Sequence, residues 1–100
     1  MSVDADWLDR HTAHAPSALR HRVHSYTAAS AGDSLPLQLS VAADAALTRV
    51  LNQPGDRSVA LDLLAADALI TLALLAQAQT APERLEEFAI SVLRAWRSDA

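Results

Sequence analysis

The chain has 100 residues, 51% of them apolar, which suits a single globular domain with one packed core. Its formal net charge is −4 and every basic residue is an arginine, so we expect no nucleic-acid binding, because nucleic-acid-binding domains normally carry a basic face. The chain has no cysteine, which excludes disulfides, thiolate metal sites and cysteine nucleophiles.

The apolar residues are mostly alanine and leucine, the strongest helix formers, whereas β-branched and aromatic residues are scarce. This composition predicts an all-α fold, in which residues 1–100 form a single domain. We expect a compact bundle of three long helices plus one or two shorter N-terminal helices. The acidic start MSVDADWLDR lacks the pattern of a secretory signal, so we expect a soluble, cytoplasmic protein.

The N-terminal third of the chain predicts two short helices. Residues 1–14 are expected to form a peripheral helix or arm that is anchored by Trp7 and Leu8. A second helix is expected to begin at Pro16, because proline suits the first helical position. Its apolar residues fall on one helical face: Leu19, Val23 and Tyr26.

Residues 31–36, AGDSLP, lie directly before a third predicted helix. We expect this helix over residues 36–52, with Leu39 on the far side from a broad apolar surface. That surface is expected to consist of Leu37, Val41, Leu47, Val50 and Leu51. Asp33 or Ser34 is expected to cap it, by accepting hydrogen bonds from amides of the first turn that have no partner within the helix.

The Gly-Asp-Ser-Leu in this stretch also resembles two reactive-serine motifs. One belongs to a hydrolase family, whose serine follows a β-strand in a much larger α/β domain. The other is the Asp-Ser-Leu of acyl carrier proteins, whose serine opens a helix and carries a prosthetic group. The chain shows no strand pattern, and Pro36 departs from the carrier pattern. We therefore expect Ser34 to be a helix cap, with a carrier-type serine and a nucleophile as alternatives.

A fourth helix is expected from Val59 to Ala78, capped by Asp56 or Ser58. It is apolar on nearly every side, which is typical of a buried central helix or a membrane span. Asp62 and Asp67 argue against a span, because each costs about 2.5–3.5 kcal/mol at the centre of a bilayer. We therefore expect a buried core helix and no membrane contact.

Asp67 is the most conspicuous polar residue of this helix, because burial raises the pKa of a carboxyl group and such groups often serve a function. Thr71 lies one turn away, within reach of its side chain. We expect Asp67 to pair with an arginine of another helix, such as Arg49 or Arg57, or to face a subunit interface. One acid without a partner base is not an active site.

Residues 63–73, LLAADALITLA, resemble a helix of the polyprenyl synthases, which are all-α enzymes that build isoprenoid chains. The chain lacks the Asp-Asp-x-x-Asp motifs that bind magnesium diphosphate in that family, and it is much shorter than those enzymes. The resemblance therefore implies similar helix packing, and no activity or site residue is carried over.

The last helix is expected to begin near Thr80 and Glu83, which have capping-box spacing, with Pro82 in its first turn. Its glutamates lie near the start and its arginines near the end, which matches the helix dipole. Its apolar residues form one stripe: Leu85, Phe88, Ala89, Val92 and Trp96.

Four histidines form two His-x-x-His pairs near the N-terminus: His11 with His14, and His21 with His24. The second pair lies on one predicted helix, at a spacing that lets two imidazoles reach one Zn²⁺ or Ni²⁺ ion. We consider a metal site at His21 and His24, with a solvated polar face as the alternative.

The predicted function rests on apolar side chains outside the main stripes. Leu39 and Ile90 lie off the stripes of their helices, and we expect them, with Trp96, to contact a partner. The protein is then a non-enzymatic interaction or oligomerisation module without a cofactor, either a homodimer or bound to a helical protein. The alternatives are a small-ligand or metal-binding bundle that uses the histidines and a carrier domain modified on Ser34.

Overall fold

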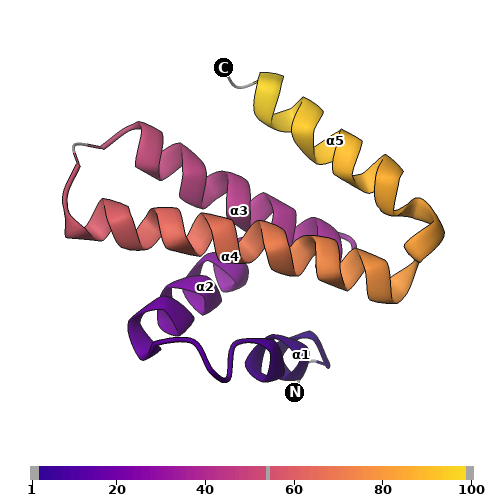
Figure 1. The fold of residues 1–100 in the computed structure, drawn as a ribbon, viewed down its shortest axis with the longest axis horizontal. Helices are drawn as coiled ribbons and strands as arrows, with labels where there is room; N and C mark the ends of the chain where they lie inside the picture. Colours follow the sequence, from indigo (N-terminus) through magenta and orange to yellow (C-terminus); the bar gives the residue numbers. More distant parts are fainter. Residues whose placement is uncertain (1–2, 54, 99–100) are drawn as a thin grey trace.

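Helices make up nearly all of the structure, a computed structural model that describes residues 3–53 and 55–98 (Figure 1). Within these residues there is no strand, so the predicted all-α bundle is confirmed. The elements are, in chain order, α1 (Val3–His11), α2 (Ser17–Ala29), α3 (Leu35–Leu51), α4 (Arg57–Thr80), the short 3₁₀ helix η1 (Pro82–Arg84) and α5 (Leu85–Ser98).

The antiparallel pair of α3 and α4 forms the centre of the bundle (Figure 1). The two helices bury small side chains against each other, so their backbones approach closely. Alanine also has the highest helix propensity, so these contact residues favour both helices individually. The buried alanines are Ala42, Ala43 and Ala46 of α3, with Ala65, Ala66, Ala73 and Ala76 of α4.

Leu39 lies in this core with 0% of its surface exposed, so the prediction that it faces away from the apolar surface of α3 is wrong. Leu37, Val41 and Leu51, which we expected to form that apolar surface, are instead exposed. The physical reason is that the alanines of α3 determine which side faces α4. Leu39 is one turn from Ala43 and shares its face.

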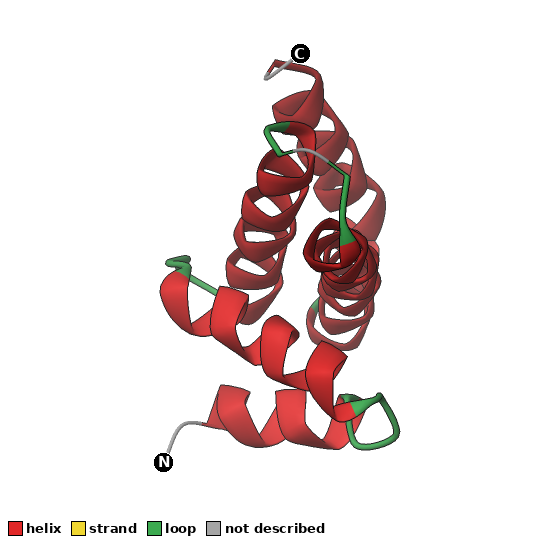
Figure 2. Cartoon of the chain, turned by 90° about the vertical axis from the view of Figure 1, so that its left-hand side faces the viewer, coloured by secondary structure: helices red, strands yellow, loops and turns green. Residues whose placement is uncertain are grey.

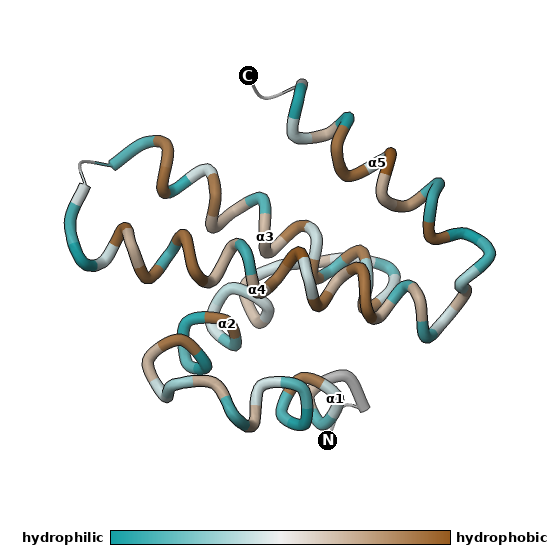
Figure 3. Tube along the Cα trace, viewed as in Figure 1, coloured by the Kyte–Doolittle hydropathy of each residue, from teal (hydrophilic) through white to brown (hydrophobic). Residues whose placement is uncertain are grey.

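The helix α4 is less buried than its sequence predicts. Its inner face is buried, but Leu63, Leu64 and Leu75 are 52%, 55% and 38% exposed on its outer face. Figure 3 shows apolar residues along most of α4.

By length and composition alone, α4 is the one helix in the described residues that is apolar enough to cross a membrane. Core helices of soluble proteins share this property. Here it is the central helix of a compact globule, which is consistent with a soluble protein.

The two N-terminal helices lie on the opposite side of the α3–α4 pair from α5 (Figures 1 and 2). As predicted, Leu8 and Val23 are buried in the core, and Leu19 and Tyr26 pack against it. Trp7 also packs against the core, and its indole N–H donates to Oε1 of Gln79 at 2.8 Å. This hydrogen bond joins α1 to the end of α4.

The connection into α5 differs from the predicted capping box. Thr80 is the last residue of α4, and its hydroxyl donates to the Ala76 carbonyl at 2.7 Å instead of capping α5. The residue before η1 is Ala81, which has no side-chain acceptor to offer. Phe88 and Trp96 then pack α5 against the core.

Candidate functional site

The Gly-Asp-Ser-Leu stretch forms the corner between α2 and α3. The Ser34 hydroxyl accepts a hydrogen bond from the Leu37 amide at 3.4 Å, which makes Ser34 the N-cap of α3. The side-chain amide of Gln38 donates to the Thr27 carbonyl at 2.9 Å and so satisfies the end of α2. A Cβ atom at position 32 would lie 2.6 Å from the backbone nitrogen of Gln38, so only glycine allows the two backbone segments to come this close.

Two of the four residues predicted as caps act as caps. Besides Ser34, Asp56 caps α4, and its carboxylate accepts a hydrogen bond from the Val59 amide at 3.0 Å. Asp33 is exposed, and the cap that it was expected to share belongs to its neighbour Ser34. The fourth residue, Thr80, ends a helix instead of starting one.

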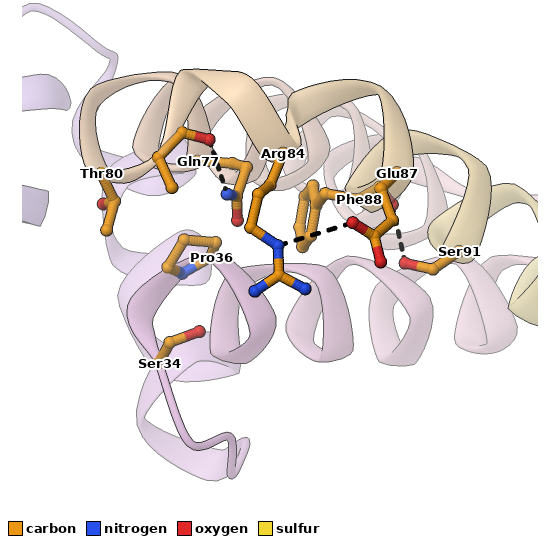
Figure 4. Close-up of a pocket in the computed structure, with 9 residues that line it drawn as sticks. Ser34, Pro36, Gln77, Thr80, Arg84, Glu87, Phe88 and Ser91 are labelled. Carbon is orange, nitrogen blue, oxygen red and sulfur yellow. Dashed lines mark hydrogen bonds and ion pairs between the residues drawn. The ribbon is translucent and has the colours of Figure 1, made fainter.

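Ser34 lines two neighbouring clefts, of about 310 and 350 Å³, that lie between the start of α3, the end of α4 and α5. Figure 4 shows the first cleft, with Ser34 on one side and Arg84 and Phe88 on the other. Arg84 forms an ion pair with Glu87 at 3.5 Å. Neither cleft is lined by a histidine, so neither brings Ser34 the imidazole base that commonly activates a serine nucleophile.

The second cleft continues along α3 and α5 and has mainly apolar walls. Leu37 and Val41 line it from α3, and Phe88, Val92 and Trp96 line it from α5. This lining suits an apolar group better than a charged one.

The predicted metal pair is only partly assembled. His24 Nε2 lies 3.3 Å from Oδ1 of Asp9 and 3.4 Å from the Thr12 hydroxyl, which ties α2 to α1. A shallow pocket beside these residues is lined by Asp9, His24 and also His21. In residues 3–53 and 55–98, no group of three or more histidines or carboxylates is placed to hold a metal ion. Among these residues, the fold therefore does not bring a complete set of metal ligands to His21 and His24.

Asp62, not Asp67, is the buried carboxylate of α4. Its side chain is 0% exposed, and Oδ1 accepts hydrogen bonds from Arg22 Nη1 at 2.5 Å and from the Tyr26 hydroxyl at 2.9 Å. Arg49 Nε lies 3.6 Å from Oδ2. The predicted pairing with an arginine of another helix is thus found for Asp62, whereas Asp67 is exposed.

We call Asp62, Arg22, Tyr26 and Arg49 the Asp62 cluster. It joins α2, α3 and α4, and none of the clefts described above reaches it. Burial, followed by the hydrogen bond to Asp62 and the negative charge of Asp62, raises the pKa of Tyr26 above its ordinary value. The sequence carries a signal for this cluster: Arg22 and Tyr26 lie one turn apart, so both can reach the same acceptor on a neighbouring helix.

The residues expected at an interface are not equally accessible. Leu39 is in the core and cannot contact a partner, whereas Ile90 is 41% exposed on the outer face of α5. Trp96 is half-buried and lines the second cleft. Along the outer face of α5 lies a shallow hollow of about 640 Å³, lined by glutamates, Ile90, Ser91 and Arg94.

Comparisons with known proteins supply no relative: no family model matches the chain, and neither curated proteins nor solved structures give a match. The functional argument therefore rests on the surfaces and contacts described above.

The caps of α3 can be separated by a pair of alanine substitutions. Ser34→Ala removes the acceptor for the Leu37 amide and should lower the free energy of unfolding by about 1 kcal/mol. Asp33→Ala removes no cap and should change it by less than about 0.5 kcal/mol. Urea unfolding of both variants measures the difference; equal losses would show that both residues cap α3.

The two aspartates of α4 should also differ in their contribution to stability. Asp62→Ala leaves Arg22 without its carboxylate partner and should cost about 3 kcal/mol, at the low end of the range for a broken buried ion pair because Arg22 retains some exposure. Asp67→Ala is the matched control and should cost less than about 0.5 kcal/mol. Denaturant unfolding checks this, and a similar cost for both would contradict the structural role of the Asp62 cluster.

The raised pKa of Tyr26 predicts a loss of stability in alkali. The folded protein binds the phenol proton of Tyr26 more tightly than the unfolded chain does. The protonated phenol therefore stabilises the folded state, and this contribution is fully present below pH 10.0, the ordinary tyrosine pKa. It is lost as the pH rises through the folded pKa. Urea unfolding at increasing pH should show this decline in the wild type and a smaller one in Tyr26→Phe. Because Tyr26 is the only tyrosine, its tyrosinate absorbance gives the pKa directly.

Proposed function

We propose that the protein is a non-enzymatic helical module of the cytoplasm that acts through protein contacts and associates with itself. The observation that carries the proposal is the alignment of exposed apolar side chains on the outer faces of two helices. Leu63, Leu64 and Leu75 are exposed on α4, and Ile90 and Leu93 are exposed on α5.

The spacing of these residues distinguishes them from scattered exposed leucines, which are normal on a protein surface. Leu64 and Leu75 lie on one face of α4, with the exposed Asp67 and Thr71 between them. On α5, Ile90 and Leu93 are three residues apart. Apolar side chains that gather on one helix face mark contacts with other proteins more often than isolated residues do.

A catalytic role has less support from the same surfaces. Ser34 acts as a helix cap and has no histidine in its clefts, and Asp62 is enclosed by its arginine and tyrosine partners. His21 and His24 have one carboxylate beside them, Asp9. The arrangement supports binding through apolar faces better than it supports chemistry.

The test is the molar mass of the wild-type chain as a function of concentration, by light scattering coupled to size exclusion. We expect the mass to rise from one chain toward two as the concentration increases through the micromolar range, because closed two-fold pairing is the commonest assembly. A mass of one chain at every concentration would contradict self-association.

A further inference from the structure

Four charged residues of η1 and the outer face of α5 are spaced symmetrically about Ile90. Glu83 and Glu86 precede it by seven and four residues, and Arg94 and Arg97 follow it by four and seven residues. All four charged side chains are exposed. The face is therefore acidic at one end and basic at the other, with an exposed isoleucine at its midpoint.

Helical geometry places these residues on a single face. Positions four and seven residues apart return to nearly the same side of an α-helix. Glu83, Glu86, Ile90 and Arg94 indeed line one shallow hollow. Val92 and Phe88 lie on the other side of the helix and pack inward.

We propose that two copies of the chain pair through α5 in an antiparallel, two-fold arrangement, with the two Ile90 side chains in contact at the symmetry axis. The proposal rests on the self-association proposed above and specifies its surface. Each copy then places Glu86 opposite Arg94 of the other copy, and Glu83 opposite Arg97 of the other copy. A parallel pairing brings like charges together instead.

The residues nearest the axis fit the same arrangement. A two-fold axis at Ile90 sets Leu93 of one copy beside Glu86 of the other, because the two side chains project toward the same edge of the interface at nearly the same height. Leu93 is 59% exposed in the single chain, and the aliphatic part of a glutamate side chain can cover it. Glu87 keeps its ion pair with Arg84 of its own chain.

The outer face of α4 is a poorer candidate for two-fold pairing. Asp67 lies in the middle of its exposed leucines, between Leu64 and Thr71. A two-fold axis there sets the two Asp67 carboxylates near each other, with no basic residue between Leu63 and Leu75 to offset them. Charge complementarity therefore selects α5 as the surface that a second copy fits.

One pair of 14-residue helices makes a small interface, below the roughly 800 Å² per partner of a standard complex. The dimer should therefore dissociate on dilution. Opposite charges at the rim favour the correct register and lose strength with added salt, so the dimer should also weaken as the salt concentration increases.

Charge reversal tests the register. Glu86→Arg places arginines opposite each other, and Arg94→Glu places glutamates opposite each other, so each variant alone should dimerise at least tenfold more weakly than the wild type. An equimolar mixture of the two variants should restore dimers, because the new arginine of one chain faces the new glutamate of the other. Sedimentation equilibrium measures association, and circular dichroism confirms that each variant keeps its helix content.

Asp67→Arg is the matched control, because it makes the same charge change on the exposed face of α4. It should leave the dimer intact. If Glu86→Arg and Arg94→Glu each dimerise as tightly as the wild type, the interface lies elsewhere and the α5 pairing is wrong, although self-association stands. A mixture of Glu86→Arg and Arg94→Glu chains that stays monomeric also overturns the α5 pairing. A wild type that is monomeric throughout removes both proposals.

Disulfide trapping provides a second test that does not depend on charge, because the chain has no cysteine. Helices that pack about 8–10 Å apart bring Cα atoms at the axis within disulfide range. Mild oxidation should therefore link Ile90→Cys chains covalently into dimers. In the control Leu93→Cys, the two sulfurs are offset along the helices by about 9 Å, which is too far to bridge. Equal linkage in both variants would contradict the proposed axis.

Discussion

The close contact between α3 and α4 is the constraint on which the rest of the structure depends. Alanines of both helices, such as Ala43 of α3 and Ala73 of α4, are buried in the core, and their small side chains let the two helices approach closely. Leu39 and Leu69 are buried with these alanines, but several of the other large apolar side chains of both helices lie on other faces. Some of these side chains, such as Leu47 and Ile70, are partly buried against the core, and others, such as Leu63 and Leu64, are exposed. The packing that stabilises the bundle thus also leaves apolar surface for contacts with other chains.

The Asp62 cluster determines how α2 joins this central pair. A carboxylate that is completely buried is costly unless it is paired, and Arg22 and Tyr26 of α2 both bind Asp62 Oδ1. Arg49 adds a contact from α3. Since a buried ion pair contributes little net stability over an apolar contact of similar size, its main consequence here is geometric. The rotation of α2 places Arg22 and Tyr26 toward Asp62, so these contacts hold α2 in register with α4.

The last helix has a different character from the others. It buries few side chains, chiefly Val92, and its outer face carries separated acidic and basic ends around Ile90. A helix that packs lightly on its own domain and presents a self-complementary face is suited to pairing with another copy. The proposed dimer therefore uses Ile90 and the charge order of α5, and it leaves the exposed leucines of α4 uncovered.

The sequence alone determined the helical class, the approximate bounds of each long helix and the charge order of α5, and it limited the caps of α3 and α4 to two candidates each. These features depend on propensity, local hydrogen bonds and the order of residues along one helix. Only the tertiary structure decided that Leu39 is buried, that Asp62 and not Asp67 is enclosed, and that α4 has an open face. An alanine- and leucine-rich helix is apolar on nearly every side, so its own pattern does not indicate which side faces inward. That choice is made by the helix that packs against it, where the closest approach falls on the smallest side chains.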